Sequence, residues 1–127
     1  MNCVACHEPM IVLELDQVEI DYCLACSGIW LDSGELAILL GQPDHVDAIL
    51  HSLDAGLQKR KSKRKCPICL KRMEEFTPAS ASDLYIDRCR KEHGLWFDRG
   101  ELEQVLQLFK TEKSKLVQAL LNSMFNR

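Results

Sequence analysis

The first 58 residues of this 127-residue chain contain no lysine or arginine, although they hold ten acidic residues. A segment with a formal net charge of −10 repels phosphate, so this half is excluded as a nucleic-acid contact. All sixteen basic residues fall in residues 59–127, where nine acids leave a net charge of +7. Two halves of opposite sign can attract each other within one chain or between chains.

Long apolar runs are missing as well. No run reaches the roughly 18 residues that a membrane-spanning helix requires. We expect no signal peptide, because the first cysteine pair begins at Cys3. We therefore expect no membrane contact, and reduced cysteines that hold a metal indicate the cytoplasm.

The motifs of common enzymes are also absent. The sequence contains no glycine-rich loop that would cradle phosphates, and no serine has a recognisable base partner. We expect no catalysis, and this expectation would change only if a metal site had three protein ligands and a bound water.

Cysteine, in contrast, is abundant and regularly spaced. Six of the seven cysteines form three Cys-x-x-Cys pairs, and the seventh is followed four residues later by a histidine. The candidate ligands are Cys3, Cys6, Cys23 and Cys26 in the first half and Cys66, Cys69, Cys89 and His93 in the second. Each pair brings two soft donors to one ion, and the far pair returns on a hairpin to complete a tetrahedron. We predict two structural zinc ions per chain.

Other readings of these residues remain open at this point. Glu92 stands where the fourth cysteine of the second site would be, so it competes with His93 as a ligand. A four-cysteine site also accepts iron, and residues 3–7 match the c-type haem attachment pattern. The paired occurrence of the two sites, one of them with a histidine, favours zinc at both.

A longer repeat shows that the halves are copies of one module. Residues 26–36 recur as residues 92–102. The residues that recur 66 positions later are Gly28, Trp30, Asp32, Gly34, Glu35 and Leu36. Asp32 and Asp98 each favour the start of a helix, because a glutamate three residues later can reach back to the capping amide. We expect Trp30 and Trp96 to pack under the metal hairpins as a small core.

These patterns predict an α+β fold of two tandem zinc ribbons, each followed by a helix. Strands are expected at 10–15, 18–22, 73–77 and 84–88, and helices at 35–40 and 101–109. Residues 1–42 form the first ribbon with its helix, 43–65 an amphipathic helix (44–57) and a basic linker, 66–110 the second ribbon with its helix, and 111–127 a C-terminal amphipathic helix. The C-terminal helix carries an apolar face of Leu116, Val117, Leu120, Leu121, Met124 and Phe125.

The pattern Cys-x-x-Cys, hairpin, Cys-x-x-Cys-x-Gly-x-Trp-Leu-Asp-x-Gly-Glu-Leu resembles the transcription-factor-IIB-type zinc ribbon family of small, mostly prokaryotic proteins. The likeness covers residue 3 to about residue 40, and residue 66 to about residue 109. The second copy departs from the four-cysteine form, and its Cys-x-x-x-His spacing is similar to that of some family members. The resemblance implies zinc binding and a binding role without a defined reaction.

For function, we expect a non-enzymatic module that binds a protein partner or a second copy through its apolar helix faces. The alternative is nucleic-acid binding through ribbon 2 and through Lys59, Arg60, Lys61, Lys63, Arg64 and Lys65. A third possibility is a zinc- or redox-responsive switch in which metal loss unfolds one ribbon. Site 2 would then release zinc first as pH falls, because histidine can be protonated.

Overall fold

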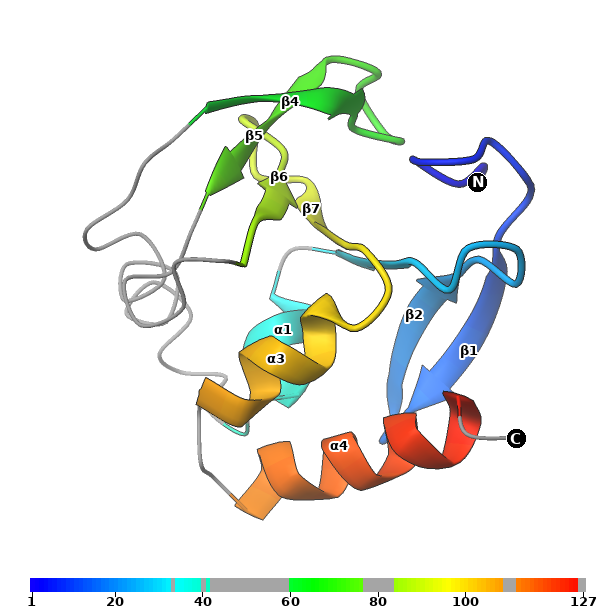
Figure 1. Cartoon of the computed structure of the whole chain (residues 1–127), viewed down its shortest axis with the longest axis vertical. Helices are drawn as coiled ribbons and strands as arrows, with labels where there is room; N and C mark the ends of the chain where they lie inside the picture. Colours follow the sequence, from blue (N-terminus) through cyan, green and yellow to red (C-terminus); the bar gives the residue numbers. More distant parts are fainter. Residues whose placement is uncertain (33, 40, 42–59, 77–83, 109–111, 126–127) are drawn as a thin grey trace.

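A computed structural model describes residues 1–32, 34–39, 41, 60–76, 84–108 and 112–125. The helix predicted at 44–57 and the first residue of the basic run, Lys59, lie outside these described residues. Figure 1 shows the helices gathered at one end of the molecule, with strands β4 and β5 at the opposite end. Within the described residues, no helix is both long enough and apolar enough to cross a membrane.

The strands form a single seven-stranded antiparallel sheet in the order β1-β2-β3-β7-β6-β5-β4. The first module supplies β1 (Ile11–Leu15), β2 (Val18–Tyr22) and β3 (Ile29–Asp32), and the second supplies β4 (Arg60–Lys65), β5 (Arg72–Phe76), β6 (Ile86–Arg88) and β7 (Gly94–Phe97). The helices are α1 (Glu35–Leu39), α3 (Glu101–Leu108) and α4 (Glu112–Phe125). The predicted α+β class is therefore confirmed.

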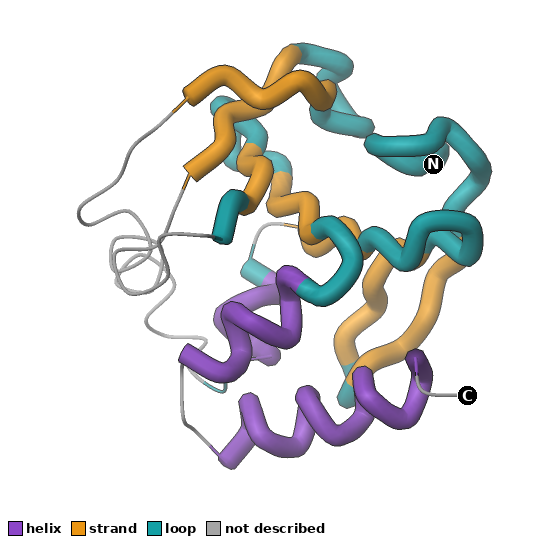
Figure 2. The backbone as a smooth tube through the Cα atoms, viewed as in Figure 1, coloured by secondary structure: helices purple, strands orange, loops and turns teal. Residues whose placement is uncertain are grey.

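The two modules meet at β3 and β7, which pair in antiparallel fashion with Trp30 opposite Trp96. These two tryptophans are equivalent positions of the 66-residue repeat, and Ile29 pairs with Phe97 as Leu31 pairs with Leu95. The register is thus the same when read from either module, so an approximate twofold axis passes between the indoles. Figure 2 shows the strands of the two modules on either side of this joint.

The sheet has two different faces, because side chains alternate along each strand. On one face, Trp30 and Trp96 belong to a buried cluster with the cysteines. On the other face, the four neighbours of the tryptophans on β3 and β7 pack against the helices. The residues that the helices contribute to this second core are Leu36, Leu39, Leu102, Val105, Leu106, Val117 and Leu121.

Strand β4 differs from the sequence prediction, which assigned the basic run to a linker. Lys61, Lys63 and Lys65 are exposed, whereas Ser62 is buried and Arg64 half-buried. This alternation has the period of a strand, and β4 pairs with the otherwise free edge of β5. The lysines face water at the edge of the sheet, where they discourage further strand pairing.

Helix α4 is separate from α3 and only partly covered. Val117 and Leu121 are fully buried in the helix-side core, whereas Leu116 is 49% and Leu120 37% exposed. The apolar face that the sequence offered to a partner is therefore used in part by the protein's own sheet and helices.

Candidate metal centres

The structure brings the eight predicted ligands together in two clusters of four. Within each cluster the ligand atoms all lie within 4.8 Å of one another. The first cluster consists of Cys3, Cys6, Cys23 and Cys26, and the second of Cys66, Cys69, Cys89 and His93. Each cluster draws two ligands from the turn before its hairpin and two from the turn after it, as the spacing predicted.

The distances within the clusters fit a tetrahedral ion. In the first cluster, the Sγ atoms of Cys3 and Cys26 are 3.5 Å apart and those of Cys6 and Cys23 are 3.4 Å apart. In the second, the Sγ of Cys69 and Cys89 are 3.8 Å apart. Four sulfurs held about 2.3 Å from one zinc ion would be separated by about 3.8 Å. The two clusters fit two zinc ions per chain.

His93 contributes its Nδ1 atom to the second cluster. This nitrogen lies 3.4 Å from the Sγ of Cys89 and 3.7 Å from that of Cys66. For zinc bonds of about 2.3 Å to sulfur and about 2.05 Å to nitrogen, the expected separation is about 3.6 Å. Glu92 is exposed and does not belong to the cluster. Of the two competing donors, the geometry therefore favours His93.

Three of the four ligand turns have the same backbone conformation. The residue four positions after the first cysteine has a positive φ, and its amide donates to that cysteine's carbonyl. These residues are His7 (φ 65°), Ser27 (φ 64°) and Leu70 (φ 61°). Amides inside the turns also point at sulfur, as when Ala5 N–H donates to Cys3 Sγ at 3.3 Å. Such hydrogen bonds favour the thiolate form that binds metal.

The fourth turn has the same length, but its ligand and its residue with positive φ have exchanged positions. As in the other turns, its first residue, Cys89, donates its amide to the carbonyl five positions later, that of Gly94. However, the positive φ falls on Glu92 (φ 62°), one position early, and the ligand His93 follows it. The ligand has therefore moved by one residue without any insertion, which explains why the repeat keeps its 66-residue offset through this turn.

The shared Trp-x-Asp-x-Gly-Glu segment links each metal turn to a helix. Trp30 Nε1 donates to Asp32 Oδ1 at 2.9 Å, and the amide of Asp32 donates to Glu35 Oε1 at 2.6 Å. The second module repeats both bonds at 3.0 and 2.7 Å. The predicted reach of the glutamate back to the capping amide is confirmed, while the aspartate side chain holds the indole. Burial raises the pKa of both glutamates, Glu35 and Glu101, to about 7.

Comparison with known protein families agrees with this geometry. The zinc ribbon family described as transcription factor zinc-finger, of the TFIIB type, matches residues 2–41 and 65–108. The two matched segments are the two modules. The chain belongs to the TFIIB-type zinc ribbon family. No curated protein and no solved structure gave a significant match.

The two zinc ribbons share one core around their metal sites. Trp30 and Trp96 have no exposed surface, and their cluster includes two buried cysteines of each site together with Val4 and Met73. A Cβ atom on Gly28 would lie 2.2 Å from the Trp96 ring, and one on Gly94 would lie 2.6 Å from the Trp30 ring. Each indole therefore rests on a glycine of the other ribbon, a joint that the sequence analysis did not predict.

Crowding changes the acidity of the ligand thiols. Burial raises the pKa of Cys26 to about 12 and that of Cys66 to about 11. A backbone hydrogen bond from Lys71 lowers the pKa of Cys69 to about 7. Neighbouring thiolates repel one another, and a divalent cation removes this repulsion. The donor set is thus suited to zinc in its charge as well as its geometry.

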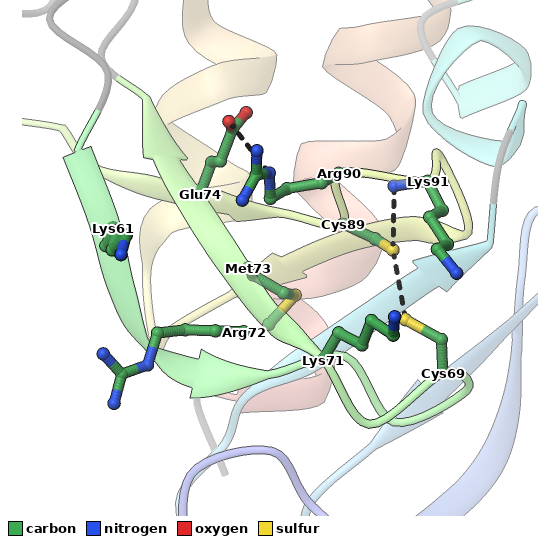
Figure 3. Close-up of a pocket in the computed structure, with 9 residues that line it drawn as sticks. All are labelled: Lys61, Cys69, Lys71, Arg72, Met73, Glu74, Cys89, Arg90 and Lys91. Carbon is green, nitrogen blue, oxygen red and sulfur yellow. Dashed lines mark hydrogen bonds and ion pairs between the residues drawn. The ribbon is translucent and has the colours of Figure 1, made fainter.

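The second zinc ribbon also carries a basic hollow of about 660 Å³, which we call the basic pocket (Figure 3). Its lining residues are Lys61, Cys69, Lys71, Arg72, Met73, Glu74, Cys89, Arg90 and Lys91. In Figure 3, Lys61 and Arg72 lie on one side of the view and Lys91 on the other, close to the ligand thiols. Arg90 pairs with Glu74 at 3.4 Å. Among the described residues, the other four cations have no carboxylate partner within ion-pair distance.

Proposed function

We propose that this chain is a non-enzymatic nucleic-acid-binding zinc protein that contacts the phosphate backbone through the basic pocket. The observation that supports this most is the concentration of five cations around one hollow beside the second metal site. If a zinc ion with three thiolates and a neutral imidazole counts as −1, and Glu74 as −1, the pocket keeps a surplus of three positive charges. Such a surplus attracts phosphates.

Several features of the pocket define the kind of contact. Among the described residues that line it there is no aromatic side chain to serve as a stacking platform for bases, so we take the backbone as the main ligand. Zinc would be held at Cys66, Cys69, Cys89 and His93, where it would fix the turns that carry the lysines. The description of the family as a transcription factor zinc-finger is in line with this role.

The absence of a reaction is part of this proposal. Each cluster offers four ligand atoms, and a closed tetrahedral shell leaves no position for a substrate or an activated water. Thiolates that hold zinc also suit a reducing compartment, so we place the protein in the cytoplasm.

The test is fluorescence anisotropy with a labelled 20-nucleotide single strand and the matching duplex, each measured from 50 to 300 mM NaCl. If the four pocket cations other than Arg90 each meet one phosphate of the duplex, log K should fall with log salt at a slope of about −3.6. The variant Lys71→Gln/Lys91→Gln keeps two of these four contacts, so its slope should be about −1.8. The absence of binding to both probes at 50 mM NaCl would refute the proposal.

The matched control is Arg99→Gln/Lys115→Gln, which removes the same charge from exposed positions outside the pocket. This control should keep at least half of the wild-type affinity at 100 mM NaCl. If it weakened binding as much as the pocket variant does, net charge rather than the pocket would be responsible. Zinc content should be two per chain in every preparation compared.

Self-association through α4 is a second candidate, supported by the exposure of Leu116 and Leu120 one turn apart. Light scattering after size exclusion would report the mass, and Leu116→Asp/Leu120→Asp should convert an oligomer to a monomer. A wild-type monomer at 100 µM protein would end this candidate. Leu121 is unsuitable for the test because it is fully buried in the protein's own core.

A further inference from the structure

The contact between the indoles and the glycines places part of each ribbon's core in the other ribbon. Gly28 lies two residues after Cys26 of the first site, and its backbone is covered by Trp96 of the second ribbon. Gly94 directly follows His93 of the second site, and it is covered by Trp30 of the first ribbon. Each metal turn is therefore part of the surface on which the opposite indole is buried.

We propose that the two ribbons bind zinc as one unit, so that a ribbon closed around its ion raises the zinc affinity of the other. A ribbon of this size does not fold without its ion, because it buries too little apolar surface. When one ribbon opens, its turn no longer covers the opposite tryptophan, which is otherwise without exposed surface. The remaining ribbon must then expose an indole to water, which weakens its hold on zinc.

The sheet adds a second link between the sites. Strand β3 connects the first site to its helix and pairs along four residues with β7, which connects the second site to α3. If β3 is not ordered, β7 becomes the edge of a smaller sheet and loses these hydrogen bonds. The two links act in the same direction, and couplings between sites in proteins are commonly 5- to 150-fold in affinity. We expect a coupling of at least about tenfold here.

A zinc titration followed by native mass spectrometry tests this on the unmodified chain. When the mean occupancy is one zinc per chain, two uncoupled sites give a one-zinc fraction of about one half if they are equal, and more if they are unequal. Positive coupling alone brings this fraction below one half. With tenfold coupling of equal sites, we expect it to fall to about one quarter. Because the two sites differ in their ligands, which by itself raises this fraction, a fraction of one half or more overturns the proposal when the second site of Gly28→Ala also keeps its wild-type zinc affinity.

Gly28→Ala tests the route of the coupling. The new methyl group cannot occupy its place while Trp96 keeps its own, yet Gly28 ligates neither zinc. We expect the zinc affinity of the second site to fall by at least about tenfold, measured in competition with a chelator. Zinc at the second site is identified because it protects Cys66, Cys69 and Cys89 from alkylation. Loss of zinc from the first site alone would contradict the proposal, because the new methyl group also lies 3.3 Å from Cys26 Sγ and can disturb that site directly.

Leu24→Ala is the control within the same turn, since the Leu24 side chain is 70% exposed. It should leave the one-zinc fraction at the wild-type value. If Gly28→Ala also retained the wild-type fraction and the wild-type affinity at the second site, the tryptophan contact would not couple the sites. These experiments use zinc alone, so their outcome does not depend on whether the basic pocket binds nucleic acid.

Discussion

At the scale of single residues, the fourth metal turn shows how one ligand can change position in a loop of constant length. In the first module Cys26 is followed by the left-handed residue Ser27, and in the second the left-handed Glu92 is followed by the ligand His93. The closing hydrogen bond from Cys89 to Gly94 matches the one from Cys23 to Gly28. The two turns therefore have the same length and differ in which residue contributes the ligand.

This leads to a prediction about an exchange variant. Glu92→Cys/His93→Ser gives the second turn the sequence order of the first, so we expect it to keep two zincs per chain. His93→Ser alone leaves three thiolates and should lose zinc from the second site. Cobalt substitution is the measurement, because a fourth thiolate strengthens the sulfur-to-cobalt charge-transfer absorption. An exchange variant that binds no more metal than His93→Ser would contradict the equivalence of the turns.

At the scale of elements, the first residue of α3, Glu101, has a carboxyl group that is unfavourable to ionise because it is partly buried. The pKa of Glu101 is raised to about 7 by burial, and the charge of Asp98 contributes in the same direction. Between its ordinary value of 4.5 and about 7, the folded protein binds this proton more tightly than the unfolded chain does. The stabilisation is complete below pH 4.5 and is lost as the pH rises through 7.

We therefore predict that Glu101→Gln reduces the loss of stability between pH 6 and pH 8. Glutamine keeps an oxygen that can accept from the Asp98 amide, and it has no charge to bury. After allowance for partial exposure, the gain relative to wild type on going from pH 6 to pH 8 should be about 1 kcal/mol. Glu112→Gln at the exposed start of α4 is the control and should show no such change. Urea unfolding in excess zinc measures both.

Strand β4 depends on a buried polar contact as well as on backbone pairing. Ser62 Oγ donates to Asp87, which is 4% exposed and whose pKa is raised to about 6 by burial. Ser62→Ala leaves a buried carboxylate without this donor, and we expect a loss of about 1–2 kcal/mol in the free energy of unfolding. Lys63→Ala, on the same strand but exposed, should cost less than about 0.5 kcal/mol. Equal losses from the two changes would show that Ser62 has no special role.

The sequence predicted the elements that repeat and missed those that depend on contacts between the modules. The ligand spacing predicted both metal clusters, and the Asp-x-x-Glu pattern predicted the helix starts at Glu35 and Glu101. β3 and β7 were not predicted as strands, because each is short and completes its pairing only against the other. The basic composition of residues 59–65 predicts a linker, and nothing in it indicates that Ser62 is buried in a strand. The pocket could not be predicted, since β4, β5 and the last metal turn meet only in the fold.

At the scale of the whole molecule, both tryptophans report on the same event. Trp30 and Trp96 have no exposed surface and lie between the two metal sites. Removal of zinc by a chelator should therefore shift the emission of both indoles to longer wavelength. Trp30→Phe and Trp96→Phe each leave one reporter, and we predict that within each variant this reporter shifts over the same chelator range in which both zincs leave. A remaining indole whose emission follows the release of only one zinc would mean that each ribbon opens by itself.

The same joint changes what acidification is expected to do. The sequence alone suggested that the second site releases zinc first, because its histidine can be protonated. If the ribbons form one unit, release from the second site uncovers Trp30 and weakens the first site as well. The interval between the two releases should then be narrower than the ligand chemistry of two separate ribbons would give.

The self-matching register of β3 and β7 has a consequence for the history of such chains. A module that existed alone could make this joint with an identical copy, tryptophan against tryptophan, as a twofold homodimer. Once duplication joins the two copies in one polypeptide, the partners no longer need to be identical. One copy can then carry no basic residue while the other carries many, and this chain has such a division, with net charges of −10 and +7. In the function proposed above, the first half of the fused pair supplies a scaffold and the second half the binding surface.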